Sequence, residues 1–369
     1  MSPNSYGHGL QPGHFFLPGP TEVHLDVLAA QNHSVISHRG AGIQKLMESM
    51  QIGLKSVFMT ERSVFVSTSS ATGLMEAAIR NGVRRKVLCL VNGAFSQRFV
   101  EIAMACEREV ETMEVEWGQT IDLGLLRDRL ATGGFDAVTV VHSETSTGVL
   151  HDLAAISAVV REFDDVLLLV DSVTGAGGAE LRTDDWQLDF VLTGSHKALA
   201  MPPGLSFGVA SERMMDRART LPGRGMYFDL VAFEENVAQY QTPTTPAVTL
   251  MYAAAEQLGR ISAETMPSRW ARHQEMSAQT YAWIEAMVAK GVGLTVLAPE
   301  GSRSPTVTCL RLPEGSDGPG VVKAMKERGF VIGGGYGKLK PDTFRIGHMG
   351  DHTPDELAIV LHTLTEVFS

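Results

Sequence analysis

The first two thirds of the chain alternate short apolar runs with segments whose apolar residues recur at helical spacing. The run Val166–Val170 has no polar residue at all, which is typical of a strand buried on both faces of a parallel sheet. This alternation predicts an α/β fold with a mixed, mostly parallel seven-stranded sheet and helices on both faces. The predicted strands are Val64–Thr68, Val87–Val91, Glu111–Val115, Ala137–Val141, Val166–Val170, Phe190–Thr193 and Leu205–Ala210.

The pattern changes near residue 250. A long helix-like region runs from Tyr252 through Lys290, and strand-like and helix-like segments follow it at 306–312 and 321–328. A closing helix is predicted after Thr353, because a proline follows this N-cap threonine and Glu356 completes a capping box. We therefore expect an N-terminal segment (residues 1–20), a large domain (21–250) and a smaller C-terminal α+β domain (251–369), joined at the proline-rich stretch 242–246.

The charge balance argues against nucleic acid and anionic membranes as partners. There are 42 Asp and Glu residues against 31 Lys and Arg, a net charge of −11, and no basic patch. The 3 cysteines are far apart and form no CxxC pair, so we expect a reducing compartment. No apolar run approaches the ~18 residues of a membrane span. These features predict a cytoplasmic protein.

Three segments that follow predicted strands carry candidate chemistry. The small residues Ser69–Gly73 begin a helix, where free N–H groups favour a phosphate, although an ordinary N-cap has the same composition. Asp171 directly follows an apolar strand, where ligands gather in α/β sheets, although an aspartate there can also cap a turn. Lys197 follows the next strand and becomes a nucleophile if it is buried, although most such lysines are solvated.

Five motifs in a fixed order resemble those of the class V aminotransferases, and within them the alanine/serine–glyoxylate (or pyruvate) branch. The resemblance covers the chain from about residue 15 to its C-terminus. It implies fold type I, the fold of aspartate aminotransferase, and pyridoxal 5'-phosphate (PLP) as cofactor. The motifs are FLPGPT at Phe16–Thr21, HSETSTG at His142–Gly148, VDSV at Val170–Val173, SHKAL at Ser195–Leu199 and RIGHMG at Arg345–Gly350.

The resemblance assigns roles to the three segments. Lys197 would form the Schiff base with the cofactor aldehyde and then move a proton between substrate and cofactor carbons, and Asp171 would pair with the pyridine nitrogen. Ser70, Ala71 and Thr72 would hold the phosphate. The family usually has glycine at the position of Ala71 and histidine or threonine at that of Thr72, so this loop departs slightly from the pattern.

Four further residues would surround the cofactor. Phe95 matches the aromatic residue that stacks on the pyridine face, and Val173 would pack on the opposite face. Thr145 would approach the phenolic oxygen of the cofactor or the substrate. His196 matches a polar position beside the lysine that can reach the phosphate, although a histidine satisfied within the core is an equal alternative.

The resemblance also implies roles toward the substrate and toward a second subunit. Arg345 would bind the α-carboxylate of the amino acid through its planar guanidinium. Thr244 matches a residue that reaches the neighbouring subunit's cofactor phosphate, which implies a homodimer with shared active sites. Several relatives have a tyrosine where this chain has Gln241, with Tyr240 one position earlier. Arg39 is a further cation that could enter the cleft.

These features favour an aminotransferase that passes nitrogen from a small amino acid to a small 2-oxo acid by a ping-pong mechanism. A monocarboxylic donor such as alanine, serine or glycine is preferred, because no second cation for a distal carboxylate is evident. A PLP-dependent lyase or cysteine desulfurase is the alternative, although Cys89 and Cys309 lie inside predicted strands, and a non-catalytic member is a third hypothesis. No metal site is predicted: His348 and His352 are separated by a glycine that interrupts a helix.

Overall fold

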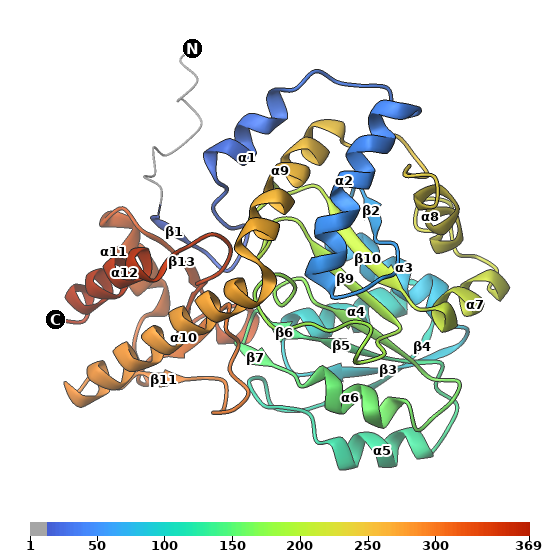
Figure 1. The fold of residues 1–369 in the computed structure, drawn as a ribbon. Coiled ribbons are helices and arrows are strands. Elements are labelled where there is room, and N and C mark those ends of the chain that lie inside the picture. The colour runs from blue at the N-terminus through green and yellow to red at the C-terminus, as the bar shows by residue number, and fades with distance from the viewer. Residues whose placement is uncertain (1–12) are drawn as a thin grey trace.

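A sheet of seven strands forms the centre of the protein in the computed structural model, which describes residues 13–369 (Figure 1). Residues 1–12 of the predicted N-terminal segment lie outside the described residues. The strand order is β2-β10-β9-β8-β5-β3-β4. The strands are β2 (Phe65–Ser67), β3 (Lys86–Val91), β4 (Glu109–Glu114), β5 (Ala137–Val141), β8 (Leu167–Asp171), β9 (Phe190–Gly194) and β10 (Ser206–Ala210).

One strand runs against the others. β10 is antiparallel to both of its neighbours, β2 and β9, and every other pair in the sheet is parallel. The carboxyl ends of β2, β3, β4, β5, β8 and β9 therefore lie along one edge of the sheet. Each of the seven predicted strands overlaps an observed one, so the prediction of a mixed, mostly parallel sheet is confirmed.

Helices cover both faces of this sheet. α3 packs with α4 and α7, and α5 packs with α6. Right-handed crossovers put α4 on the face opposite α5 and α6, because the chain reverses its direction across the sheet after β4. The helices of this region are α1 (Leu25–Ala29), η2 (Ala30–Asn32), α2 (Ala41–Phe58), α3 (Ala71–Gly82), α4 (Ala94–Ala105), α5 (Leu123–Ala131), α6 (Leu153–Val160), α7 (Glu212–Thr220) and α8 (Leu230–Val237).

A second, five-stranded sheet in the order β1-β13-β14-β12-β11 belongs mainly to the C-terminal part of the chain. Its apolar cluster includes Phe16, Phe344 and Leu361, so the N-terminal strand β1 joins it by pairing in parallel with β13. The predicted boundary at residue 250 stays a prediction. The elements are β1 (Phe15–Phe16), β11 (Thr295–Val296), β12 (Thr308–Arg311), α11 (Gly318–Glu327), β13 (Val331–Gly334), η3 (Gly337–Leu339), β14 (Thr343–Ile346) and α12 (Pro354–Val367), with a separate hairpin of β6 (Ser143–Glu144) and β7 (Val149–Leu150).

The long helix-like region is two helices, α9 (Val248–Glu264) and α10 (Met266–Ala289). They are separated by Thr265, whose φ of 70° lies in the left-handed region and whose side chain caps α10. Pro267 in the first turn of α10 cannot donate a backbone hydrogen bond to α9, which gives the break a physical reason. The capping box of Thr353 and Glu356 at the start of α12 is present as predicted.

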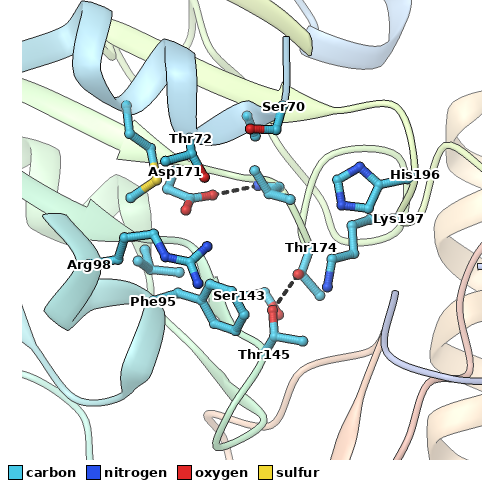
Figure 2. Close-up of a pocket in the computed structure, with 14 residues that line it drawn as sticks. Ser70, Thr72, Phe95, Arg98, Ser143, Thr145, Asp171, Thr174, His196 and Lys197 are labelled. Carbon is cyan, nitrogen blue, oxygen red and sulfur yellow. Dashed lines mark hydrogen bonds between the residues drawn. The ribbon is translucent and has the colours of Figure 1, made fainter. Parts of the chain in front are cut away.

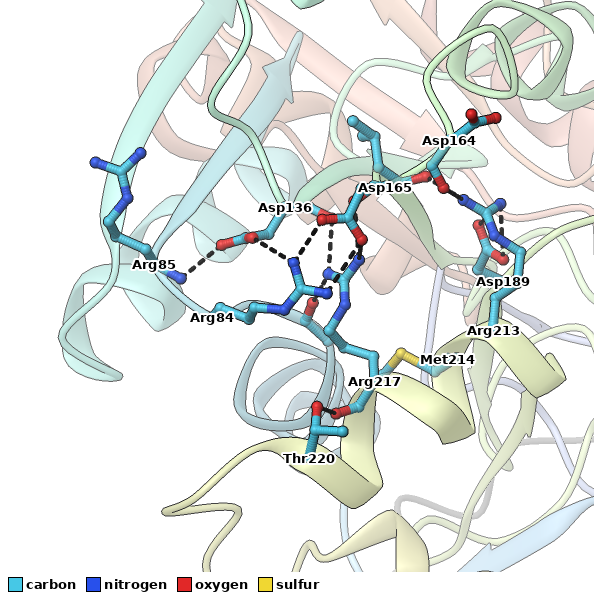
Figure 3. Close-up of polar contacts among 12 residues, drawn as sticks. Arg84, Arg85, Asp136, Asp164, Asp165, Asp189, Arg213, Met214, Arg217 and Thr220 are labelled. Carbon is cyan, nitrogen blue, oxygen red and sulfur yellow. Dashed lines mark hydrogen bonds and ion pairs between the residues drawn. The ribbon is translucent and has the colours of Figure 1, made fainter.

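Charged side chains join the strands at the edge where the strands begin. Figure 3 shows Arg217 of α7 beside Asp165, with Asp136 and Arg84 next to them. The buried Arg217 guanidinium donates to the carbonyls of Gly82, Asp136 and Asp165 at 2.8–3.1 Å and to Asp165 Oδ1 at 2.7 Å. This arginine therefore links the end of α3 to the segments that precede β5 and β8. Within residues 13–369, the helices are all too short or too polar to cross a bilayer.

Candidate active site

A pocket lies at the carboxyl edge of the large sheet, and its walls come from segments that follow five parallel strands. β2, β3, β5, β8 and β9 are each followed by residues that line it. This is where open α/β sheets bind ligands. The lining residues, most of them labelled in Figure 2, are Ser70, Ala71, Thr72, Met75, Phe95, Arg98, Val141, Ser143, Thr145, Asp171, Val173, Thr174, His196 and Lys197.

Nine of the eleven predicted site residues are in this set, although they are spread over more than a hundred positions of the chain. They are Ser70, Ala71, Thr72, Phe95, Thr145, Asp171, Val173, His196 and Lys197. Arg345 and Thr244 are not among the residues that line the pocket.

Lys197 is 6% exposed and lies on the turn after β9. Its Nζ donates to the carbonyl of Pro18, and Thr21 Oγ1 donates to the Lys197 carbonyl at 2.8 Å. Burial and, to a smaller extent, the Arg345 guanidinium lower the pKa of Lys197, Asp171 opposes them, and the net pKa is about 7. A large fraction of this amine is therefore neutral near pH 7, the state in which it is a nucleophile.

Asp171 is the last residue of β8 and is 3% exposed. Its Oδ1 accepts the backbone N–H of Val173 at 2.8 Å. Burial raises the pKa of Asp171 to about 6, and the Val173 N–H is the main opposing effect. Among residues 13–369 this carboxylate accepts one hydrogen bond, and a buried carboxylate with so few donors is well suited to a cationic partner in the pocket.

The start of α3 faces the same pocket. Ser70 is the N-cap, yet its side chain makes no capping hydrogen bond, and Ala71 and Thr72 form the first turn. This end of the helix thus has uncapped N–H groups and the positive end of the helix dipole, both of which favour an anion.

The other predicted residues lie around the pocket wall. The half-buried Phe95 ring has Lys197 Nζ 5.6 Å from its centroid. Thr145 and Thr174 share a hydrogen bond of 2.5 Å between their hydroxyl groups. Burial lowers the pKa of His196 to about 4, with Lys197 as a second cause, so this imidazole is neutral.

Arg345 lies next to the pocket, in contact with the lining residue Thr145, whereas no contact of Thr244 with a lining residue is seen among the described hydrogen bonds. Arg345 donates from Nη1 to the carbonyl of Thr145 at 3.1 Å and from Nε to the carbonyl of Gly334 at 2.8 Å. The Thr244 carbonyl accepts from the Thr242 hydroxyl at 2.8 Å. Arg39 is exposed and donates to the carbonyl of Pro243 at 3.3 Å, so within this chain it does not enter the pocket.

The buried Lys197 and Asp171, at the ends of neighbouring parallel strands, lie within a region that matches a known family. Residues 22–341 match the family model described as aminotransferase class-V. The chain belongs to the class V aminotransferases. It is a transaminase by family, and this family is PLP-dependent.

The class V relationship extends over the whole described fold. The chain is 31% identical to the serine–glyoxylate aminotransferase of Methylorubrum extorquens, covering 92% of this chain and 88% of the relative. It is also 31% identical to the L-aspartate–glyoxylate aminotransferase of Paracoccus denitrificans, covering 93% and 88%. The crystal structure of alanine–glyoxylate aminotransferase from Nostoc sp. matches with a TM-score of 0.90 and 30% identity, covering 97% and 96%. Fold type I and the predicted branch of the class V family are confirmed.

Sequence reasoning did not single out Arg98, whose guanidinium lines the pocket 4.8 Å from the Phe95 ring centroid. Its position three residues after Phe95 on one helix was the available signal, because such residues share a helical face. Tyr336 was also missed: its ring lies 5.4 Å from that of Phe95 and 5.6 Å from the Arg345 guanidinium. Arg98 is the second cation near the pocket that the sequence did not reveal.

Proposed function

We propose that this class V aminotransferase binds PLP in the pocket and moves an amino group from a small amino acid to a small 2-oxo acid such as glyoxylate or pyruvate. The observation that carries the proposal is the joint burial of Lys197 and Asp171 in one pocket with the Phe95 ring. The residues fit the cofactor chemically, since an amine, a carboxylate, an aromatic face and an uncapped helix start match its aldehyde, ring nitrogen, ring and phosphate.

Bound PLP supplies an aldehyde that captures amines and a cationic ring that accepts the electron pair left when a Cα–H bond breaks. Lys197 would provide the amine that holds the aldehyde and would act as the general base that takes the proton from Cα of the substrate. Its pKa of about 7 suits both tasks near neutral pH. Asp171 would pair with the ring nitrogen and hold the proton on it.

The other pocket residues orient the cofactor. Ser70, Ala71 and Thr72 hold its phosphate at the start of α3, where the helix dipole adds to the hydrogen bonds. Phe95 and Val173, which both line the pocket, would pack against the cofactor ring. Thr145 serves the phenolic oxygen or the substrate, and the neutral His196 is placed to donate to the phosphate. Together they keep the breaking bond aligned with the ring.

Arg345 binds the α-carboxylate of the donor. Its Nε and Nη1 are already held by two backbone carbonyls, which fixes the plane of the guanidinium and leaves Nη2 and the second Nη1 hydrogen for the substrate. Neutral donors such as alanine, serine or glycine need no further cation. Since Arg98 also lies in the pocket, aspartate belongs among the donors to be tested.

We propose a homodimer with shared sites, in the reducing cytoplasm. Thr244 is half-buried and is not among the residues that line its own chain's pocket, which supports a role toward the neighbouring subunit. The cysteine desulfurase alternative is disfavoured further, because Cys89 and Cys309 are buried in β3 and β12. Burial raises the pKa of their thiols to about 11 and about 12, so neither is a reactive thiolate.

A panel of half-reactions tests the proposal. The PLP-loaded protein is mixed with alanine, serine, glycine or aspartate alone, and conversion of the cofactor to its amine form is followed by absorbance. We expect conversion with alanine or serine and reversal by glyoxylate or pyruvate, and no conversion in Lys197→Ala. If purified wild-type protein does not bind PLP, or binds it but converts it with none of these donors, the proposal is wrong.

A further inference from the structure

Glu144 carries a fully buried carboxylate, 0% exposed, that belongs to no ion pair with a lysine or arginine in the part of the chain described. Burying an unpaired carboxylate is costly unless hydrogen bonds replace its hydration. Five donors surround it. They are the backbone N–H groups of Phe95, Ser96 and Ser146 and the hydroxyls of Ser96 and Ser146, with the shortest bond, from Ser146 Oγ, at 2.6 Å.

Two of those N–H groups belong to the first turn of α4, which has no side-chain cap from its own N-cap residue. That residue is Gly93, and a Cβ at Gly93 would overlap the Glu144 side chain. The carboxylate therefore occupies the space where a serine or aspartate N-cap would place its own side chain. Ser146 Oγ accepts the third N–H, from Ala94, at 3.0 Å. A segment distant in sequence thus caps α4, and the helix dipole favours its negative charge.

The helix turn that Glu144 caps is the one that places Phe95 in the pocket. Glu144 Oε2 accepts the Phe95 N–H at 3.1 Å and the Ser96 N–H at 2.9 Å. The next residue along the chain, Thr145, lines the pocket itself, and Arg345 donates to its carbonyl. The Glu144 carboxylate is therefore hydrogen-bonded to the backbone that carries Phe95, and Glu144 is also the chain neighbour of Thr145, a second residue of the pocket wall.

We propose that Glu144 is a positioning residue: it fixes the Phe95 backbone so that the ring stands against the cofactor face. This inference rests on the proposed function, because the cofactor is the partner of the ring. A glutamine in place of Glu144 is nearly the same size but presents one oxygen and one NH2 group to five donors, so its NH2 group opposes N–H or O–H groups. The start of α4, and Phe95 with it, would shift.

The test compares cofactor binding by apo-protein in Glu144→Gln, Phe95→Leu and the double variant. The loss of one aromatic stacking contact is expected to weaken cofactor binding by about fivefold. We expect each single variant to raise the dissociation constant of PLP by about that factor, and the double variant to resemble Phe95→Leu rather than show the product of about twenty-five-fold. The circular dichroism of the bound cofactor should change in the same way, because it reports the tilt of the ring.

Asp189→Asn is the matched control. Asp189 is an equally buried carboxylate that accepts the Leu168 N–H and the Ser211 hydroxyl at the opposite edge of the sheet. We expect it to lower thermal stability without changing the dissociation constant of PLP or its circular dichroism. Ser146→Ala is the milder second variant, since it removes the shortest bond to Glu144 and should act in the same direction if Glu144→Gln does not fold.

Three outcomes would contradict either the proposed function or the positioning role of Glu144. A wild-type protein that does not bind PLP overturns the proposed function. If the wild type binds PLP, unchanged binding and circular dichroism in Glu144→Gln, or in Ser146→Ala where the first does not fold, overturn the positioning role alone. Effects of Glu144→Gln that multiply with those of Phe95→Leu overturn it too, because the carboxylate would then act independently of the ring.

Discussion

The backbone of Gly19 lies against the side chain of Lys197. A Cβ at Gly19 would overlap the Cδ, Cε and Nζ atoms of the lysine, and the preceding residue, Pro18, accepts the hydrogen bond from its Nζ. Gly19 also has a φ of 105°, in the region that favours glycine. The N-terminal FLPGPT motif is therefore part of the wall that confines the amine.

Gly19→Ala should impair the attachment of PLP to Lys197, because the added methyl group displaces the amine. We expect the rate of cofactor incorporation into apo-protein to fall by more than ~10-fold, as for loss of orientation at a reacting group. Gly291→Ala is the control, since Gly291 has a φ of 89° but has no atom within 4 Å of an added Cβ. An equal effect of both substitutions would attribute the loss to backbone strain rather than to the contact.

The pH dependence of cofactor capture should follow the pKa of about 7 that burial gives Lys197. Only the neutral amine attacks an aldehyde, so the rate of PLP attachment to apo-protein should rise with pH up to about 7 and level off above it. Stopped-flow absorbance across neutral pH measures this rate. A lysine-containing peptide treated with the same PLP should keep rising toward its ordinary pKa of about 10.4. A protein curve parallel to that of the peptide would refute the lowered pKa.

Asp171→Asn should leave the fold intact and remove the anion proposed to pair with the ring nitrogen of the cofactor. Asparagine Oδ1 can still accept the Val173 N–H, so the local turn is retained. We expect kcat to fall by about 10²- to 10³-fold, the size typical of losing a preorganised electrostatic group. Asp152→Asn, at the exposed N-cap of α6, should have kcat near that of the wild type. Wild-type kcat in Asp171→Asn would exclude the ring-nitrogen role.

Arg345→Gln should weaken donor binding, since a neutral amide replaces the guanidinium proposed to bind the substrate carboxylate. Hydrogen bonds to charged groups are worth ~1.5–3 kcal/mol, so we expect KM for alanine or serine to rise by about 10- to 100-fold. The PLP dissociation constant should change little. Arg311→Gln, on the neighbouring strand β12 and paired with Asp342, is the control and should keep the wild-type KM. Equal KM values in both variants would remove the carboxylate role.

Arg217→Met should destabilise the fold without affecting chemistry. The substitution leaves the carbonyls of Gly82 and Asp136 without this donor and breaks the bond to Asp165, so we expect a loss of ~2–4 kcal/mol in the free energy of unfolding. Urea denaturation measures it. Arg219→Met, on the exposed side of the same helix, should change stability little because its ion pairs are solvated. Similar midpoints for the two variants would contradict the assigned role of Arg217.

Local sequence was sufficient for the strands and for the helix signals that depend on neighbouring residues. Apart from the edge strand β4, whose sequence is EVETME, the strands of the large sheet are mainly apolar because the sheet is covered on both faces. The capping box at Thr353 needs only residues within one turn. The break at Thr265 was missed because the apolar repeat continues across it, although Pro267 was a local signal that a helix begins there.

The site divides in the same way. The sequence by itself determined which residue types follow each strand and in what order, and a family resemblance supplied their roles. Because the carboxyl ends of parallel strands meet at one edge of the sheet, these residues could be expected to lie together even though they are far apart in the chain. Only the tertiary structure decided that Arg98 lines the pocket, that Gly19 confines Lys197 and that Glu144 caps α4. The physical reason is that burial, shifted pKa values and such hydrogen bonds depend on contacts between distant segments, which no local spacing encodes.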